Sequence, residues 1–162
     1  MTPAVRNRLL GLGLVWGLLL AAVPAFVMTD PYELSGLLIA GVLCAAVSGA
    51  VGTLAAGRRA ARGGVQNNRT VVAGLGTGFF QGLIGGGIAA LSFWAIMGVT
   101  LSGFALDNPI ELSTLMRPQV FLGSFFVALS VFIYVVAAGV LLGPAFGTLV
   151  NRAARSGAKG GP

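Results

Sequence analysis

The sequence predicts an all-α integral membrane protein in which four transmembrane helices form two tandem parallel helical hairpins. Three observations lead to this prediction: the composition, four long apolar runs, and the positions of the basic residues. Of the 162 residues, 56% are hydrophobic and only 9% are charged, and the mean hydropathy is +0.93. A soluble domain usually carries about 25% charged residues. Because so few charges cannot cover a water-exposed surface, we expect lipid to surround the chain.

The first two apolar runs predict the first hairpin. They cover about residues 9–28 and 34–56, within a hairpin unit at residues 1–65. Crossing a bilayer takes roughly 20 apolar residues in a helix, and both runs reach that length. The first run also has the basic start and the "VPA" (residues 23–25) of a signal peptide, but it is longer than a typical signal core. We therefore expect a membrane span at this position.

The second hairpin unit is predicted at residues 66–155. Its spans cover about residues 71–99 and 120–142, and the first of them is longer than a bilayer needs, so it should tilt or emerge at one end. Between them, residues 104–117 are too polar to span yet keep several large apolar side chains. We expect part of this segment to lie at the membrane interface. Residues 156–162 are expected to form a flexible tail.

Basic residues fix the predicted orientation of these spans. With four spans, one side of the membrane holds nine of the ten bases, namely Arg6, Arg8, Arg58, Arg59, Arg62, Arg69, Arg152, Arg155 and Lys159. Arg117 falls on the other side with the four acids, Asp30, Glu33, Asp107 and Glu111. The positive-inside rule then places both termini in the cytoplasm of a bacterial cell, with the chain in the inner membrane.

The clustered arginines predict contact with lipid. The sequence "RAAR" occurs twice at predicted span ends, and basic residues at such positions attract anionic headgroups. We therefore expect membrane lipid, and no nucleic acid, as the partner of the net positive charge. The predicted headgroup anchors are Arg58, Arg59, Arg62, Arg152 and Arg155.

An internal repeat is predicted from motifs that recur in the same order. "DPYELSGLL" (30–38) matches "DNPIELSTLM" (107–116), and "GTLAAGRRAAR" (52–62) matches "GTLVNRAAR" (147–155). Each copy contains two spans, so both copies would enter the membrane in the same sense. Such a parallel repeat differs from the inverted repeats of many transporters.

Glycines recur every fourth residue in the predicted spans, in the manner of a glycine zipper. Residues four apart share one face of a helix, and small residues there let two backbones approach closely inside a membrane. Close packing must offset the roughly 0.8–1 kcal/mol that each glycine costs in a helix. The pattern leaves open whether the partner helix belongs to this chain, an identical chain or another subunit. The predicted packing positions are Gly74, Gly78, Gly82 and Gly86, with Gly13, Gly17, Gly41 and Gly49 in the first hairpin.

Gln81 is the most polar side chain within the predicted spans. It could line a polar path for a solute, or it could form an interhelical hydrogen bond, and we favour the bond. The spans contain no Asp, Glu, Lys, Arg or His. Ion and proton pathways usually need such groups, so this composition weighs against a proton-coupled transporter.

The sequence offers little for catalysis or cofactor binding. The chain has no histidine and one cysteine, Cys44, whereas zinc, haem and iron–sulfur sites usually need several such ligands. We therefore expect no enzyme, metal or cofactor. The predicted function is a structural or accessory subunit that packs through glycine-rich helix faces against itself, as a homo-oligomer, or against a larger membrane complex. The alternative is a small oligomeric channel or transporter, with a path lined by the glycines of residues 71–99 and by Gln81.

Overall fold

The computed structural model describes residues 2–27, 35–62, 71–101 and 117–156. These ranges form five helices and no strand. The helices are α1 (Pro3–Val27), α2 (Ser35–Arg62), α3 (Val71–Leu101), α5 (Pro118–Leu141) and α6 (Gly143–Ser156). All except α6 are long and apolar enough to cross a membrane. The prediction of an all-helical protein with four such helices is therefore confirmed, and these four helices are compatible with a multi-pass membrane protein.

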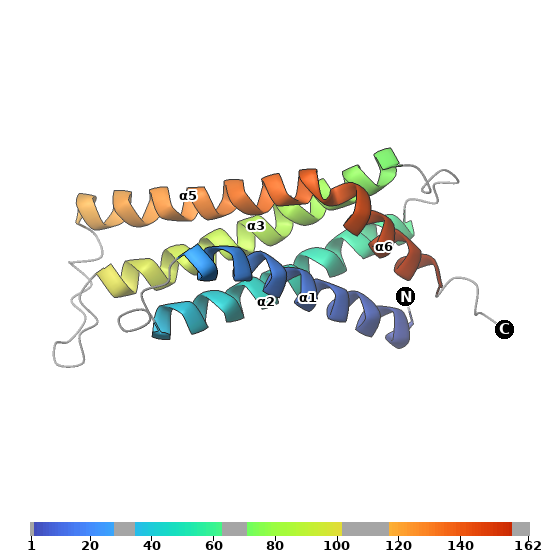
Figure 1. Cartoon of the computed structure of the whole chain (residues 1–162), viewed down its shortest axis with the longest axis horizontal. Helices are drawn as coiled ribbons and strands as arrows, with labels where there is room; N and C mark the ends of the chain where they lie inside the picture. The colour runs from blue at the N-terminus through green and yellow to red at the C-terminus, as the bar shows by residue number, and fades with distance from the viewer. Residues whose placement is uncertain (1, 28–34, 63–70, 102–116, 157–162) are drawn as a thin grey trace.

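The four long helices run alternately up and down. In Figure 1, α1 and α3 lead away from the end that holds both termini, and α2 and α5 return to it. The main contacts follow chain order, because α1 packs on α2, α2 on α3, and α3 on α5. The predicted origin of the two antiparallel pairs by duplication stays a prediction.

The helices extend further than the apolar runs that predicted them. α1 begins at Pro3, where a proline suits the first helical position because its missing N–H would have no partner there. α2 continues through its arginines to Arg62. α3 has 31 residues and is roughly 46 Å long at 1.5 Å per residue, well beyond a hydrocarbon core of about 30 Å.

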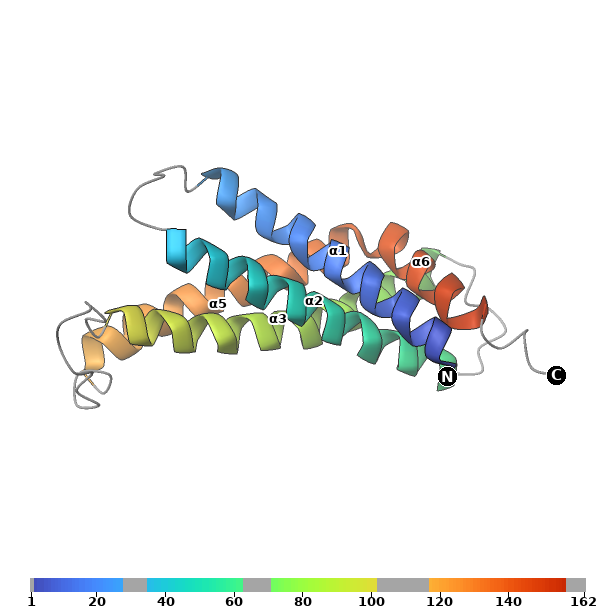
Figure 2. The ribbon, with the colours of Figure 1, turned by 90° about the horizontal axis from the view of Figure 1, so that it is seen from below.

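A break after Leu142 separates α5 from α6, and the sequence analysis did not predict α6 as a helix of its own. Leu142 keeps an α conformation and its N–H donates to the Ala138 carbonyl. Pro144 follows two residues later; it has no N–H, and its ring clashes with the carbonyl four residues earlier. The helix axis therefore turns here, and Figure 2 shows α6 lying beside α1.

One face of α6 completes a core with α1. Phe146 and Val150 are buried against Val5, Leu9 and Trp16 of α1. The rings of Trp16 and Phe146 are stacked, with centroids 4.2 Å apart. Because α6 also packs on α2 and α3, it joins the first antiparallel helix pair to the second.

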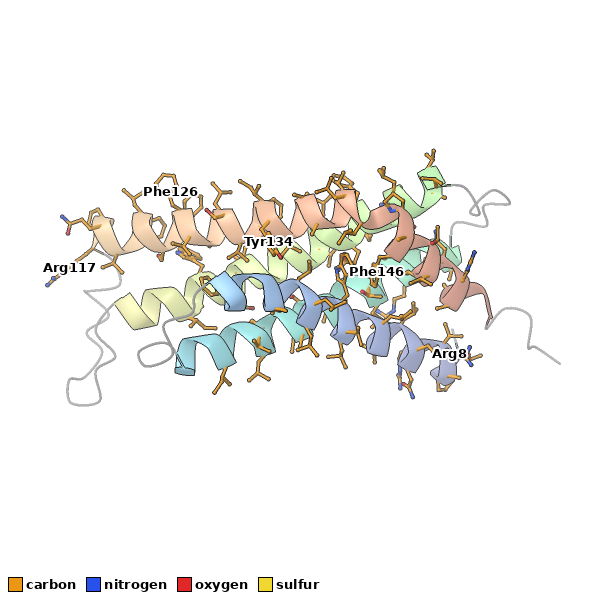
Figure 3. The ribbon with its side chains drawn as sticks, viewed as in Figure 1. Arg8, Arg117, Phe126, Tyr134 and Phe146 are labelled. Atoms are coloured by element: carbon orange, nitrogen blue, oxygen red, sulfur yellow. The ribbon has the colours of Figure 1, made fainter. Side chains whose placement is uncertain are left out.

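The outward surface of the long helices is apolar. On α2 the exposed side chains recur every fourth residue at Ile39, Leu43, Val47 and Val51. Such a stripe suits lipid rather than water. Figure 3 shows Arg8 and Arg117 at opposite ends of the bundle, as the predicted topology requires.

Several predictions fall on residues outside the described ranges. All four acidic residues lie there, as do the tail beyond Ser156 and the interfacial segment up to residue 116. The two "ELS" motifs lie there as well, except for Ser35, which begins α2.

Candidate functional site

The glycine stripe of α3 lies against the backbone of α5 and α6. A Cβ atom placed on Gly78 would overlap the Gly143 Cα atom and lie 2.6 Å from the Gly139 carbonyl oxygen. At Gly74 the same atom would lie 2.8 Å from the Pro144 carbonyl oxygen. Real Cβ atoms essentially never approach other atoms so closely. Only glycine therefore fits at these two positions without a shift of the backbone.

The contact loosens along α3 towards its C-terminal end. A Cβ atom on Gly82 would lie 3.3 Å from the Val135 carbonyl oxygen, and one on Gly86 would lie 3.4 Å from the Phe132 carbonyl oxygen. These distances need only small adjustments of the neighbours. The tightest part of the stripe is thus at its N-terminal half, where α5 gives way to α6.

In the first helix pair, Gly13 and Gly17 of α1 face α2. A Cβ atom on Gly13 would lie 2.5 Å from the Gly49 carbonyl oxygen, and one on Gly17 would overlap the Ala45 carbonyl. Gly41 differs from these positions. A Cβ atom there would meet only the Phe93 ring, at an ordinary 3.9 Å, so the predicted close backbone approach does not extend to Gly41.

The glycines of the two "GTL" motifs make different contacts. Gly147 of α6 lies against Gly74 of α3, and both glycines belong to the hairpin unit predicted at residues 66–155. Gly52 of α2 also faces α3, and a Cβ atom on it would lie 3.0 Å from the Gly85 Cα atom. Gly52, however, belongs to the first predicted hairpin unit, whereas α3 belongs to the second. The two motifs therefore do not occupy equivalent environments, although both place a glycine on α3.

Four side chains form a group that we call the buried polar cluster: Trp16, Thr53, Gln81 and Asn151. Each has at least one nitrogen or oxygen atom with no hydrogen-bond partner among the described residues, and Gln81 has two. Gln81 is only 1% exposed and Thr53 is fully buried. Leaving a buried polar group unpaired costs about 1–3 kcal/mol. The predicted interhelical bond of Gln81 is absent from the described contacts.

Thr77 connects this cluster across α3 and α6. Its hydroxyl lies 2.9 Å from the Ala73 carbonyl oxygen and 3.0 Å from the Asn151 side-chain oxygen. One hydroxyl proton cannot serve both acceptors fully. If the Asn151 amide is turned over, its NH₂ donates to Thr77 and its oxygen is left free. Either orientation leaves one end of the Asn151 amide unpaired.

The predicted headgroup anchors lie near the end that carries both termini. Arg58, Arg59, Arg62 and Arg152 are exposed, and Arg155 lies in the last turn of α6. The Arg59 guanidinium lies over the Phe80 ring of α3, 4.4 Å from its centroid. A cation above an aromatic face is attracted by the ring quadrupole, so this arginine is held against α3 while its charge stays at the surface.

The outward side of α5 carries a regular alternation of small and large residues. We call it the α5 outer face, and it consists of Gly123, Phe126, Ser130, Ile133, Ala137 and Val140, all of them exposed. Steps of three and four alternate along it, which is the spacing of helices that pack in a left-handed pair. Figure 3 shows Phe126 pointing away from the bundle. The exposed stripe of α2, by contrast, has large residues throughout.

Sequence reasoning missed both the α5 outer face and the docking of α6. The signal for α6 was present, since Gly143, Phe146, Gly147 and Val150 share the spacing of one helix face. The arginines that follow, Arg152 and Arg155, predicted contact with lipid headgroups instead. The heptad spacing of Gly123, Ser130 and Ala137 was present too, but it lies within a run that is apolar on all sides.

Comparison of the chain with protein-family models, with curated proteins and with solved structures finds no match.

Proposed function

We propose that this protein is a small, non-enzymatic accessory or structural subunit that associates within a bacterial inner membrane through the α5 outer face. The partner is a second copy of the chain or a larger membrane complex. The observation that carries the proposal is the exposed alternation of small and large residues on that face. Lipid alone does not require small residues at every seventh position, whereas a neighbouring helix does.

The assignment of this face follows from how the other small residues are used. Gly13, Gly17, Gly74 and Gly78 are in contact with helices of the same chain. They are therefore not free to receive a partner. Gly123, by contrast, has no atom within 4 Å of the position of a Cβ, so a helix from another chain could approach α5 there.

The proposed orientation places both termini and the anchoring arginines in the cytoplasm. It is supported by the position of Arg6 and Arg8 near the start of α1 and of Arg152 near the end of α6, at the same end of the bundle. Anionic lipid at that surface would attract these charges.

Association can be tested by crowding the α5 outer face. In the triple variant Gly123→Leu, Ser130→Leu and Ala137→Leu, three large side chains would keep a neighbouring helix at a distance. We expect the parent protein to migrate as an oligomer, or with a partner, after gentle extraction from its native membrane. The triple variant should migrate as a monomer that remains folded.

Gly11→Leu and Gly76→Leu form a matched control, because both glycines are exposed and have open space around them. These variants should associate as the parent does. If the parent is monomeric in its native membrane, or if the triple variant associates normally, the proposed use of this face is wrong.

A channel or transporter remains the second candidate, and the unpaired side chain of Gln81 favours it. The other predicted wall of the path, the glycine stripe, lies against backbone atoms of α5 and α6. Flux of a small neutral solute into proteoliposomes, lost on Gln81→Leu, would support this candidate against the accessory role.

A further inference from the structure

The buried polar cluster lies where four helices come together. Trp16 comes from α1, Thr53 from α2, Gln81 from α3 and Asn151 from α6. The four helices pack on one another, since α6 contacts α1, α2 and α3, and α2 contacts α1 and α3. Asn151 lies 3.0 Å from Thr77, and Gln81 is four residues further along the same face of α3. Gln81 is therefore one helical turn of α3 from the residue that Asn151 contacts.

The other two members are tied to the same region. Trp16 stacks on Phe146, which lies on α6 five residues before Asn151. Thr53 directly follows Gly52, and a Cβ atom on Gly52 would lie 3.0 Å from the Gln81 carbonyl oxygen. α6 packs on α1, α2 and α3 and so covers this region.

Unpaired polar atoms in this position call for a partner that is not part of the protein. Lipid cannot supply hydrogen bonds inside the membrane. Buried polar side chains in proteins are nearly always paired, with protein or with ordered water. Five nitrogen and oxygen atoms of the cluster have no partner among the described residues. Native interiors hold only a few such atoms, and each of them requires an explanation.

We propose that the buried polar cluster is a binding site for a small neutral molecule that both donates and accepts hydrogen bonds. Trp16, Gln81 and Asn151 offer N–H donors, Gln81 also offers an acceptor oxygen, and the Thr53 hydroxyl can do either. The occupant therefore carries an oxygen acceptor together with an O–H or N–H donor. Water has this chemistry, and so does a small amide or polyol.

The lack of charged side chains among the four residues of the cluster argues against an ion as the occupant. No ionisable side chain from the described residues belongs to the cluster, and the chain contains no histidine. A buried ion without a counter-charge is strongly disfavoured. The proposal is independent of the proposed association, because the cluster is internal and the α5 outer face is external.

The direct test observes Gln81 in the intact protein. The chain has three glutamines, Gln66, Gln81 and Gln119. Selective ¹⁵N labelling of glutamine gives three side-chain amide signals, and Gln66→Glu with Gln119→Glu leaves the Gln81 signal alone. In a nanodisc or mild detergent, we expect magnetisation transfer between this amide and water, or between it and an added solute.

A stability measurement gives a second readout. Gln81→Met keeps the length of the side chain but removes both polar ends. If a bound molecule pairs them, the variant should melt lower than the parent by roughly 3 °C or more. If nothing is bound, removing unpaired groups should leave the melting temperature unchanged or raise it. Thr148→Val is the control, because that hydroxyl is exposed and bonded to its own helix at the Ala145 carbonyl.

Titration with acetamide or glycerol distinguishes a bound solute from bound water. A saturable rise in melting temperature that the parent shows and Gln81→Met lacks would identify a solute. Transfer from water without such a rise would identify water, and both results support the site. Absence of transfer from either source, together with Gln81→Met at least as stable as the parent, would overturn the proposal.

Discussion

The indole ring of Trp16 in α1 stacks on the phenyl ring of Phe146 in α6, with centroids 4.2 Å apart and planes inclined by 19°. This contact joins residues 130 positions apart in sequence and holds α6 over the interior of the bundle. It is part of the buried apolar cluster that links α1 to α6, together with Val5, Leu9 and Val150.

Phe146→Ala should weaken this link. Truncating a buried phenylalanine typically costs about 3–5 kcal/mol. A double-mutant cycle with Trp16→Ala should give a coupling of about 0.5–1.5 kcal/mol, the range for paired aromatic rings. Unfolding in mixed micelles measures both quantities. Phe125→Ala is the control because Phe125 is exposed, and equal losses for Phe125 and Phe146 would contradict the docking of α6.

Thr77→Val should show how much the hydrogen bond between Thr77 of α3 and Asn151 of α6 contributes to the free energy of unfolding. Valine has nearly the same shape, but the Asn151 amide would lose its one described partner. We expect a loss of about 1–3 kcal/mol in the free energy of unfolding. Thr148→Val, in which the lost hydroxyl bonds to its own helix at the Ala145 carbonyl, should change stability by less than about 0.5 kcal/mol. Similar small effects for both variants would mean that the bond does not stabilise the fold.

The proposed orientation can be checked with single cysteines at Arg8 and Arg117, which lie at opposite ends of the bundle. In a Cys44→Ala background, a membrane-impermeant maleimide added to intact cells should label Arg117→Cys. It should label Arg8→Cys only after the cells are opened. Labelling of position 8 in intact cells would show that the orientation is the reverse of the proposed one.

Substitutions at Gly17 and Gly41 can distinguish the structure from the sequence pattern. The pattern predicts close helix packing at both glycines, whereas the structure shows it only at Gly17. Gly17→Ala adds a methyl group against the Ala45 carbonyl and should cost about 1–3 kcal/mol. Gly41→Ala meets only a ring atom at 3.9 Å and should be neutral or stabilising, since alanine is the better helix former. Thermal melting in detergent separates the two. A comparable loss at Gly41 would show that its helix face is also closely packed.

The four long helices could be predicted because each apolar run is long enough to cross a bilayer. α6 could not be separated from α5 in the same way, since its apolar positions directly continue the run before Pro144. The glycine stripe predicted close contact but not its partner. Spacing alone cannot tell Gly78, which meets the backbone of α6, from Gly41, which has room for a side chain.

The candidate sites were harder to predict because they depend on which faces meet. Gln81 stood out as a polar residue in an apolar run, but its relation to Trp16 and Asn151 requires α6 to fold back over the bundle. The α5 outer face is recognisable only when the inward positions, such as Ser124 and Ala128, are known to be buried.

The glycine stripe of α3 is a contact within the chain, and a comparison of Gly78→Ala with Gly76→Ala tests this contact most directly. Both add one methyl group to the same helix, but Gly78 meets the backbone of α5 and α6 whereas Gly76 has open space around it. Gly78→Ala should lower the free energy of unfolding by about 1–3 kcal/mol. Gly76→Ala should raise it by up to about 1 kcal/mol, and neither should change the oligomeric state. Equal stability of the two variants, or dissociation of an oligomer by Gly78→Ala without loss of monomer stability, would contradict the account.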